Sequence, residues 1–357
     1  MTNPRRLSFL FIAGTLLVTA WLHLATPFVA ALFSYLALEK IHSVKKKWKG
    51  LTVTVFLVVL ATIAYGLGYI TREAVRVLPA VADQAIPSVL ELAKKNNIEL
   101  PFTDYDSLKE VGFDAVKAQV GYISSAAKFA KGATTQFLYL LVGLVVALGL
   151  FLNPRMELQR HRHAIRNNLY SMCCDEIAKR FSTLYQSFET VMGAQIIISA
   201  INAAFTGVFV LIVHLPYSEL VVGITFLCGL LPVVGNLISN TVIVGIGFTV
   251  SPRMGMIALI FLIVIHKLEY FLNSKIVGHR IKNPLWLTLV GLIIGERLLG
   301  IPGMILAPVI LNYIKVEASA VEVPDDEPRR SKRHEIDDGK GSRPTLAEVP
   351  EEKGPLQ

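Results

Sequence analysis

Charged side chains are scarce in this sequence of 357 residues. Asp, Glu, Lys and Arg make up 17% of it, whereas a soluble protein usually has about 25%. Hydrophobic residues account for 53%, and the mean hydropathy is +0.53. This composition argues against an ordinary soluble domain and predicts an all-α protein that crosses a membrane several times.

Cysteine and the motifs of catalysis are also rare. The cysteines are Cys173, Cys174 and Cys228, and they have neither CxxC spacing nor the histidine partners of a metal site. The sequence contains no phosphate-binding loop, no zinc-binding His pair and no motif that joins a nucleophile to a base. We therefore expect no enzymatic activity, no cofactor and no metal.

The basic residues that are present gather beside the apolar runs. The net charge is +8, but basic patches interleaved with aromatic residues are absent, so nucleic acid is not an expected partner. Segments 40–50 (KIHSVKKKWKG) and 154–168 (PRMELQRHRHAIRNN) are the most basic of these clusters. Because positive charge beside spanning segments favours the cytoplasmic side, both segments and the N-terminus are predicted to be cytoplasmic.

About six apolar segments have the length of a spanning helix, which needs about 20 residues. They cover residues 7–25, 26–41, 51–72, 134–153, 190–213 and 253–272. Between the third and the fourth, apolar residues recur at helical spacing without a long apolar run. We expect a small extramembrane insert of short helices there.

The predicted organisation has five parts. Residues 1–72 hold helices one to three, 73–133 the insert, and 134–189 the fourth helix with a basic amphipathic cytoplasmic segment. Residues 190–314 form the predicted transport core, which contains two broken re-entrant segments. In residues 315–357, proline, glycine and mixed charge replace large apolar residues, which predicts a disordered cytoplasmic tail.

Two apolar regions, 218–250 and 285–314, do not fit a single span. The first would be about 50 Å long as one helix, against a hydrocarbon core of about 30 Å, yet its halves are too short to span separately. Proline and glycine interrupt both regions near the middle. We therefore predict two re-entrant helical hairpins, with turns at Pro232, Gly235, Gly300, Pro302 and Gly303.

The two hairpins are predicted to enter the membrane from opposite sides. The linker 274–284 carries three basic residues and belongs on the cytoplasmic side. The first hairpin then enters from outside, and the second enters from the cytoplasm. Paired interrupted segments of this kind are the best indication in a sequence of a transporter binding site.

Polar residues recur along one face of the segment 190–213. They are Gln195, Ser199, Asn202 and Thr206, at positions i, i+4, i+7 and i+11. Polar side chains in such a stripe either join helices or line a path through the membrane. Both interpretations stay open from the sequence.

Further polar residues lie near the two predicted turns. Asn236 and Asn240 follow the first turn, and Glu269 is a candidate carrier of a proton or cation, whereas the histidine three residues before it is interpreted as structural. Glu296 and Arg297 lie near the second turn, where a charge needs a partner, so a structural contact and a transport role are equally open. The transport-site candidates are Gln195, Asn202, Asn236, Asn240, Glu269, Glu296 and Arg297.

The C-terminal half resembles a known family. The resemblance lies in GLLPVVGNLI (229–238) and KLEYFLNSKIVGHRIKNPLWLTLVGLIIGERLLGIPGMILAPVI (267–310), which are similar to the signature of the autoinducer-2 exporter family of bacterial permeases. The sequence departs from the usual pattern at Ser274 and at the pair Glu296-Arg297. The matching positions are Pro232, Gly235, Glu269, Lys275, Gly278, Pro284, Gly300, Gly303, Ala307 and Pro308.

This resemblance implies a secondary permease of the bacterial inner membrane, with both termini cytoplasmic. Members of the family export autoinducer-2, and others exchange sodium or lithium for protons. The implied partners are the lipid bilayer, a small polar solute or a monovalent cation with protons, and further copies of the chain in a homo-oligomer. We expect export of a small polar solute, with sodium(lithium)/proton antiport as the alternative and a non-transporting membrane scaffold as a further one.

Overall fold

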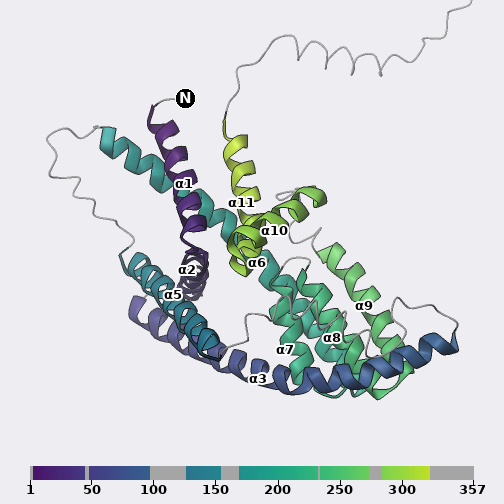
Figure 1. Cartoon of the computed structure of the whole chain (residues 1–357). Helices are drawn as coiled ribbons and strands as arrows, with labels where there is room; N and C mark the ends of the chain where they lie inside the picture. Colours follow the sequence, from purple (N-terminus) through teal and green to yellow (C-terminus); the bar gives the residue numbers. More distant parts are fainter. Residues whose placement is uncertain are drawn as a thin grey trace, which may run out of the picture. The chain divides into compact units, whose positions relative to one another are not determined.

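The computed structural model describes residues 3–44, 48–96, 126–153, 169–231, 234–272 and 284–321 (Figure 1). These residues are helical apart from short turns and contain no strand. The predicted all-α polytopic fold is therefore confirmed. Met1–Lys315 form one unit, and Val316–Gln357 form a second, of which residues 316–321 are described.

The helices follow the apolar segments because a backbone in lipid must satisfy its own hydrogen bonds. In chain order they are α1 (Asn3–Trp21), α2 (Ala25–Val44), α3 (Lys49–Lys95), α5 (Ala126–Leu152), α6 (Leu169–Val213), α7 (Ser218–Gly229), α8 (Val234–Val250), α9 (Pro252–Leu272), α10 (Leu285–Leu299) and α11 (Ile301–Ser319).

Within the described ranges, four helices are long and apolar enough to cross a membrane: α3, α6, α11 and the stretch Thr134–Leu152 of α5. Helices α1 and α2 meet at a bend of 119° and together make a fifth candidate. Only 6% of the apolar window of α3 is buried inside the protein, against 33% in α6. The surface of α3 is thus suited to lipid, whereas α6 runs through the core. The count of about six crossings and the side of each loop stay predictions.

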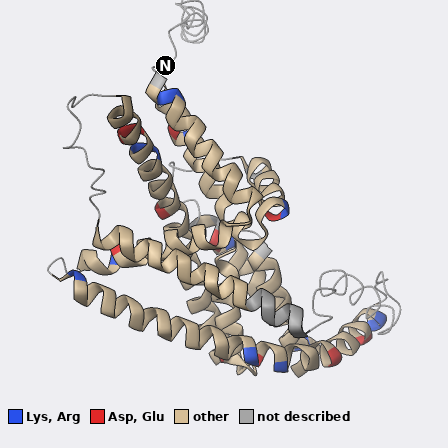
Figure 2. Ribbon diagram, turned by 60° about the vertical axis from the view of Figure 1, so that its left-hand side comes forward, with Lys and Arg blue, Asp and Glu red and all other residues tan. Residues whose placement is uncertain are grey.

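Helix α3 is longer than predicted. It does not end near residue 72 but continues to Lys95, through Pro79 and Pro87, so the short helices expected from residue 73 onward are wrong as far as residue 95. After Lys49 at its start, α3 carries no charged residue before Arg72, and its other charges lie in the second half (Figure 2). That half remains helical because its apolar face is buried against other helices, which offsets the hydrogen bonds that the prolines remove. Residues 97–125 of the predicted insert lie outside the described residues.

Helix α6 is also longer than predicted, because it begins at Leu169 rather than near residue 190. Its first half packs on α1 and α2 and continues into the apolar second half without a break, and its cytoplasmic position stays a prediction. Phe188 is fully buried there and meets Phe33 of α2 edge to face, with ring centroids 5.0 Å apart. The buried members of this cluster are Ile12, Leu36, Leu184, Phe188, Met192, Val309 and Tyr313.

Both regions predicted to be broken are indeed broken. The first forms α7 and α8, which are too short to span, and Pro232 of its predicted turn lies outside the described residues. The second breaks at Gly300, whose φ of +66° is a conformation that favours glycine. Helices α10 and α11 touch through their backbones, since a Cβ on Gly303 would lie 1.9 Å from the carbonyl oxygen of Gly295. Whether the pairs are re-entrant, and from which side, stays a prediction.

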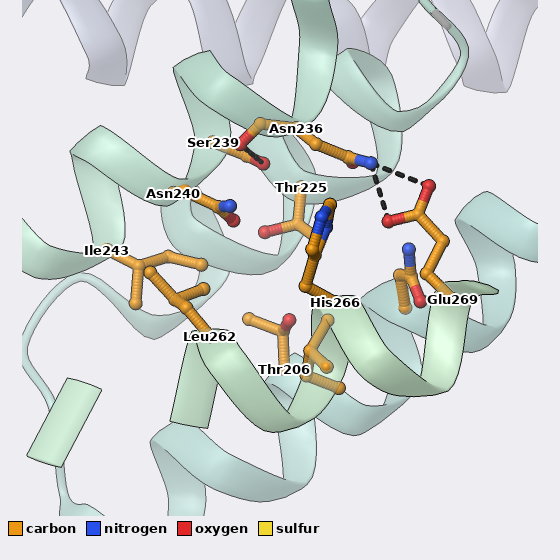
Figure 3. A pocket seen from close by; sticks show the side chains of 11 residues that line it. Thr206, Thr225, Asn236, Ser239, Asn240, Ile243, Leu262, His266 and Glu269 are labelled. Atoms are coloured by element: carbon orange, nitrogen blue, oxygen red, sulfur yellow. Dashed lines mark hydrogen bonds between the residues drawn. The ribbon is translucent and has the colours of Figure 1, made fainter. Parts of the chain in front are cut away.

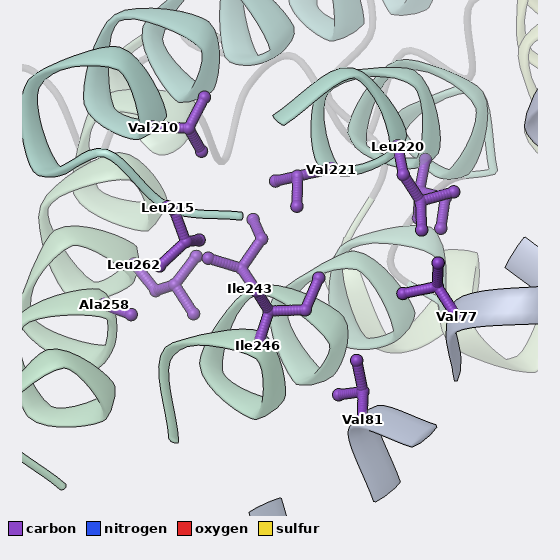
Figure 4. Packing of buried hydrophobic residues seen from close by; sticks show 11 residues of the cluster. Val77, Val81, Val210, Leu215, Leu220, Val221, Ile243, Ile246, Ala258 and Leu262 are labelled. Carbon is purple, nitrogen blue, oxygen red and sulfur yellow. The ribbon is translucent and has the colours of Figure 1, made fainter. Parts of the chain in front are cut away.

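A buried apolar cluster holds the short helices together (Figure 4). It combines residues from α3, α6, α7, α8 and α9, including Val77 and Val81 from the second half of α3. Phe209 of α6 and Phe261 of α9 stack beside it, with ring centroids 4.0 Å apart. This packing places α6, α7, α8 and α9 around one group of polar side chains.

Candidate functional site

A pocket lies among α6, α7, α8 and α9 (Figure 3). Polar side chains form most of its wall, although the surrounding helices are apolar. Its lining residues are Asn202, Thr206, Thr225, Asn236, Ser239, Asn240, Ile243, Leu262, Ile265, His266 and Glu269. Each of the four helices contributes at least one polar group.

The floor of the pocket is buried and rich in hydrogen-bond acceptors. Asn202, Thr206, Thr225 and Ser239 are each less than 8% exposed. The Thr225 hydroxyl donates to the Val221 carbonyl at 2.8 Å, and the Ser239 hydroxyl donates to the Asn236 carbonyl at 3.2 Å. Their hydrogens are therefore engaged within their own helices, and lone pairs remain for a ligand.

The side chain of Asn202 carries a buried hydrogen-bond acceptor. Its Oδ1 atom is buried and has no hydrogen-bond partner among the described residues. A buried acceptor without a partner costs about 1–3 kcal/mol, so such groups in native proteins usually meet water, an ion or a ligand. The side chain of Asn202 is thus prepared for a donor or a cation.

The titratable groups of the pocket lining are less buried than the four side chains of the floor. The Asn236 amide Nδ2 donates to both carboxylate oxygens of Glu269, at 2.6 Å each, which joins the first turn of α8 to α9. Both residues are half-buried, and His266 is exposed one turn before Glu269. A carboxylate near a helix N-terminus is also favoured by the helix dipole.

The break between α7 and α8 is held against α6. Gln195 Nε2 donates to the carbonyl oxygen of Gly229, the last residue of α7, at 2.5 Å. Gly229 also packs closely on Ser199, because a Cβ there would lie 2.8 Å from the serine Oγ. On the other side of the break, Gly235 lies so close to Cys228 that a Cβ would come within 1.6 Å of the cysteine carbonyl oxygen. The break therefore depends on glycine at both ends.

The pocket is small as it stands. The space open to the centre of a water molecule is about 10 Å³, which is room for about one water or one small ion. In the part of the chain that the structure describes, no group of three or more His, Cys, Asp and Glu could hold a metal ion. The site therefore offers neutral oxygens, one carboxylate and the imidazole of His266.

The structure brings together four of the seven predicted site residues, Asn202, Asn236, Asn240 and Glu269. Gln195 instead holds the end of α7, so the polar stripe of α6 serves both purposes that the sequence left open: its first part joins helices and its second part lines the pocket.

Glu296 and Arg297 do not join the pocket. Both are exposed on α10, because the glycines of α10 and α11 face each other and leave the charged side chains outside that contact.

Sequence reasoning missed two of the polar lining residues. Thr225 is a polar residue inside the apolar helix α7, and that signal was available. His266, interpreted as structural, precedes Glu269 by three residues, so the two share a helix face. That spacing was the signal for His266.

Comparison with known proteins completes this description. The AI-2E family transporter pattern matches residues 7–321. A Bacillus subtilis (strain 168) protein, "Putative transport protein YdbI", is 27% identical over 213 residues. This match covers 57% of the chain and 61% of the length of that relative. Since the family pattern extends over most of the sequence, the chain belongs to the AI-2E transporter family and is a multi-pass membrane protein.

Proposed function

We propose that the pocket is the solute site of a secondary permease that exports a small polar solute across the bacterial inner membrane. The observation that carries this proposal is the meeting of polar side chains from four apolar helices in one pocket. Polar groups within a membrane protein are costly unless they pair or serve a solute. Here the Asn202 oxygen is buried and unpaired, which a purely structural role does not explain.

The chemistry of the wall fits a solute rich in hydroxyl groups, such as autoinducer-2. The Asn202, Thr225 and Ser239 oxygens offer lone pairs, and hydroxyl groups of a solute would donate to them. An organic solute does not fit the present space, so the pocket must widen during transport. In transporters with broken helices, such widening accompanies alternating access.

A second candidate is exchange of sodium or lithium for protons. Two observations favour it: the space suits one water-sized species, and oxygen ligands suit hard cations. Glu269 would then hold either the cation or a proton. This alternative shares the pocket with the exporter and differs in the transported species.

The membrane arrangement belongs to the same proposal. Cytoplasmic termini and inner-membrane location are supported by the basic segments near the apolar helices. The exposed apolar surfaces of α3 and α5 suit lipid or neighbouring copies in a homo-oligomer.

The test is transport by purified protein in sealed proteoliposomes. Labelled autoinducer-2 and sodium-dependent proton flux would be followed in parallel for wild type, Asn202→Ala and Asn240→Ala. Glu296→Gln serves as the control because its side chain lies outside the pocket. We expect solute flux that both pocket variants lower and the control preserves. Sodium-dependent proton flux without solute flux would select the second candidate, and absence of both would support a scaffold.

A further inference from the structure

The pocket among α6, α7, α8 and α9 presents hydrogen-bond acceptors whose capacity the protein does not use. Asn202 Oδ1 is buried and has no hydrogen-bond partner among the described residues. The hydroxyl groups of Thr225 and Ser239 donate to carbonyl oxygens of their own helices, so their lone pairs remain. Because these acceptors line one space, a ligand that carries several hydrogens on a single atom can satisfy them together.

The lining also carries an acidic group without a Lys or Arg to offset it. Glu269 is the acidic residue, and neither Lys nor Arg is among the described residues that line the pocket. Asn236 donates to both carboxylate oxygens at 2.6 Å, which suits a charged carboxylate but adds no positive charge. Each carboxylate oxygen has about two lone-pair sites, so acceptor capacity remains beside the Asn236 amide. His266 and Lys267 of the same helix are exposed, and Lys267 does not line the pocket. The site therefore favours a cation.

Aliphatic side chains form the rest of the lining. Ile243 of α8 and Leu262 and Ile265 of α9 are each 9% exposed or less. A metal ion makes no use of hydrocarbon surface, whereas the carbon atoms of an organic cation are removed from water against it. The pocket thus combines acceptors, a carboxylate and a hydrocarbon wall (Figure 3). This combination suits a charged nitrogen that carries a short carbon substituent.

We propose that the pocket binds small primary ammonium ions, such as methylammonium, as a second class of solute beside the hydroxyl-bearing one. This inference rests on the proposed function, because it adds a class of solute to the same site. A primary ammonium group has three N–H donors on one atom. One donates to Asn202 Oδ1, one to the Thr225 oxygen and one to the Glu269 carboxylate. The nitrogen is about the size of the water molecule for which the pocket has room, and the carbon substituent lies against the hydrocarbon wall.

Binding of radiolabelled methylammonium to the purified full chain in nanodiscs tests this proposal. Unlabelled methylammonium, methanol and sodium are the competitors, at the same pH. We expect methanol and sodium to require at least about tenfold higher concentrations, since methanol lacks the charge and sodium lacks the N–H donors. Displacement by sodium as effective as that by methylammonium would overturn the proposal, because the site would then recognise charge alone. Equal displacement by methanol would overturn it as well.

Two variants remove the groups that bind the ammonium ion. Asn202→Leu loses the unpaired acceptor and Glu269→Gln loses the charge, and each should weaken methylammonium binding at least about tenfold. Asn312→Leu is the control for the first, since Asn312 is a buried asparagine of α11 that does not line the pocket. Glu219→Gln is the control for the second, because Glu219 accepts a hydrogen bond from Tyr69 at 2.8 Å outside the pocket. Both controls should bind as wild type, and equal losses in a pocket variant and its control would overturn the site.

Thr225→Val keeps the test decisive if Asn202→Leu folds poorly, because valine preserves the shape of the side chain. It removes one acceptor, so methylammonium binding should weaken about threefold. Unchanged binding to Thr225→Val together with unchanged binding to Glu269→Gln would overturn the proposal.

The proposed function fails differently. If methylammonium does not bind while autoinducer-2 flux is lost in Asn202→Ala, the solute site stands and the ammonium class is overturned. If methylammonium binds and depends on Asn202 and Glu269, but no solute is transported in proteoliposomes, the ammonium site stands and the transport function does not.

Discussion

The two broken regions of this protein both interrupt a helix, but different contacts hold the two breaks in place. The α7–α8 break is fastened to neighbouring helices by side chains, Gln195 on one side and Glu269 on the other. The α10–α11 break is closed on itself, because Gly295 and Gly303 bring the two backbones together. The first arrangement leaves polar groups around a pocket, and the second leaves Glu296 and Arg297 exposed.

The residues after each turn explain this difference. When Gly235 is aligned with Gly303, the first region continues with Asn236, Ser239 and Asn240 and the second with apolar residues and proline. Only the first turn is thus followed by side chains that can bond across helices. A shared turn pattern indicates a break in both cases, and the polar residues after it determine whether the break also builds a site.

Adding a methyl group to the close glycine contact at either break is expected to have the largest effect on stability. A Cβ at position 235 would lie 1.6 Å from the Cys228 carbonyl oxygen, and a Cβ at position 303 would lie 1.9 Å from that of Gly295. Gly235→Ala and Gly303→Ala should therefore each lose about 3 kcal/mol or more of stability. The measurement is the yield of monodisperse protein and its thermal unfolding in detergent.

Gly66→Ala is the control, because nothing lies within 4 Å of the added atom on α3. If one break tolerates alanine as well as Gly66 does, the contact there is not as close as described and the comparison between the breaks changes.

Removing the acid beside each break, Glu269 of α9 or Glu296 of α10, should separate the roles of the two breaks. Glu269→Ala leaves the Asn236 amide without its acceptor and removes the carboxylate of the pocket. Loss of a hydrogen bond to a charged group is worth about 1.5–3 kcal/mol, so transport should fall at least about tenfold. Glu296→Ala should leave the transport rate within about twofold, as expected of an exposed side chain. Flux in proteoliposomes is the measurement, and equal losses would place both regions in the transport path.

Replacing Gln195 tests the hydrogen bond between neutral groups that holds the first break to α6. Gln195→Ala leaves the Gly229 carbonyl without its donor, which costs about 1 kcal/mol. The maximal transport rate should fall about fivefold, while apparent solute affinity changes less because Gln195 does not line the pocket. Gln186→Ala, an exposed position on the same helix, is the control. A loss of affinity with an unchanged rate would instead make Gln195 a solute contact.

Much of this arrangement is readable from the sequence. Apolar length located the helices, and proline with glycine located both breaks. The polar stripe on α6 and the asparagines after the first turn pointed to the pocket, since asparagine inside an apolar run needs a partner. These signals are local, and for that reason they could be read from one chain.

The features that sequence did not reveal depend on contacts between distant segments. The continuation of α3 through Pro79 and Pro87 rests on burial of Val77 and Val81 against helices more than a hundred residues later. The outward direction of Glu296 rests on the contact between two glycines. Periodicity within one segment contains neither piece of information.

The smallest expected effect concerns the hydroxyl of Thr225 on the pocket floor. Thr225→Val keeps the shape of the side chain and loses one bond within α7, so stability should fall by about 1 kcal/mol at most. The acceptor facing the pocket is lost, and solute affinity should fall about threefold. Thr288→Val is the matched control, since that threonine also bonds to a carbonyl four residues earlier but lies on α10, outside the pocket. Solute binding to both variants can be measured by calorimetry. If Thr225→Val binds as wild type while Asn240→Ala does not, the solute contacts α8 but not the Thr225 hydroxyl, and α7 forms the floor without recognising the solute.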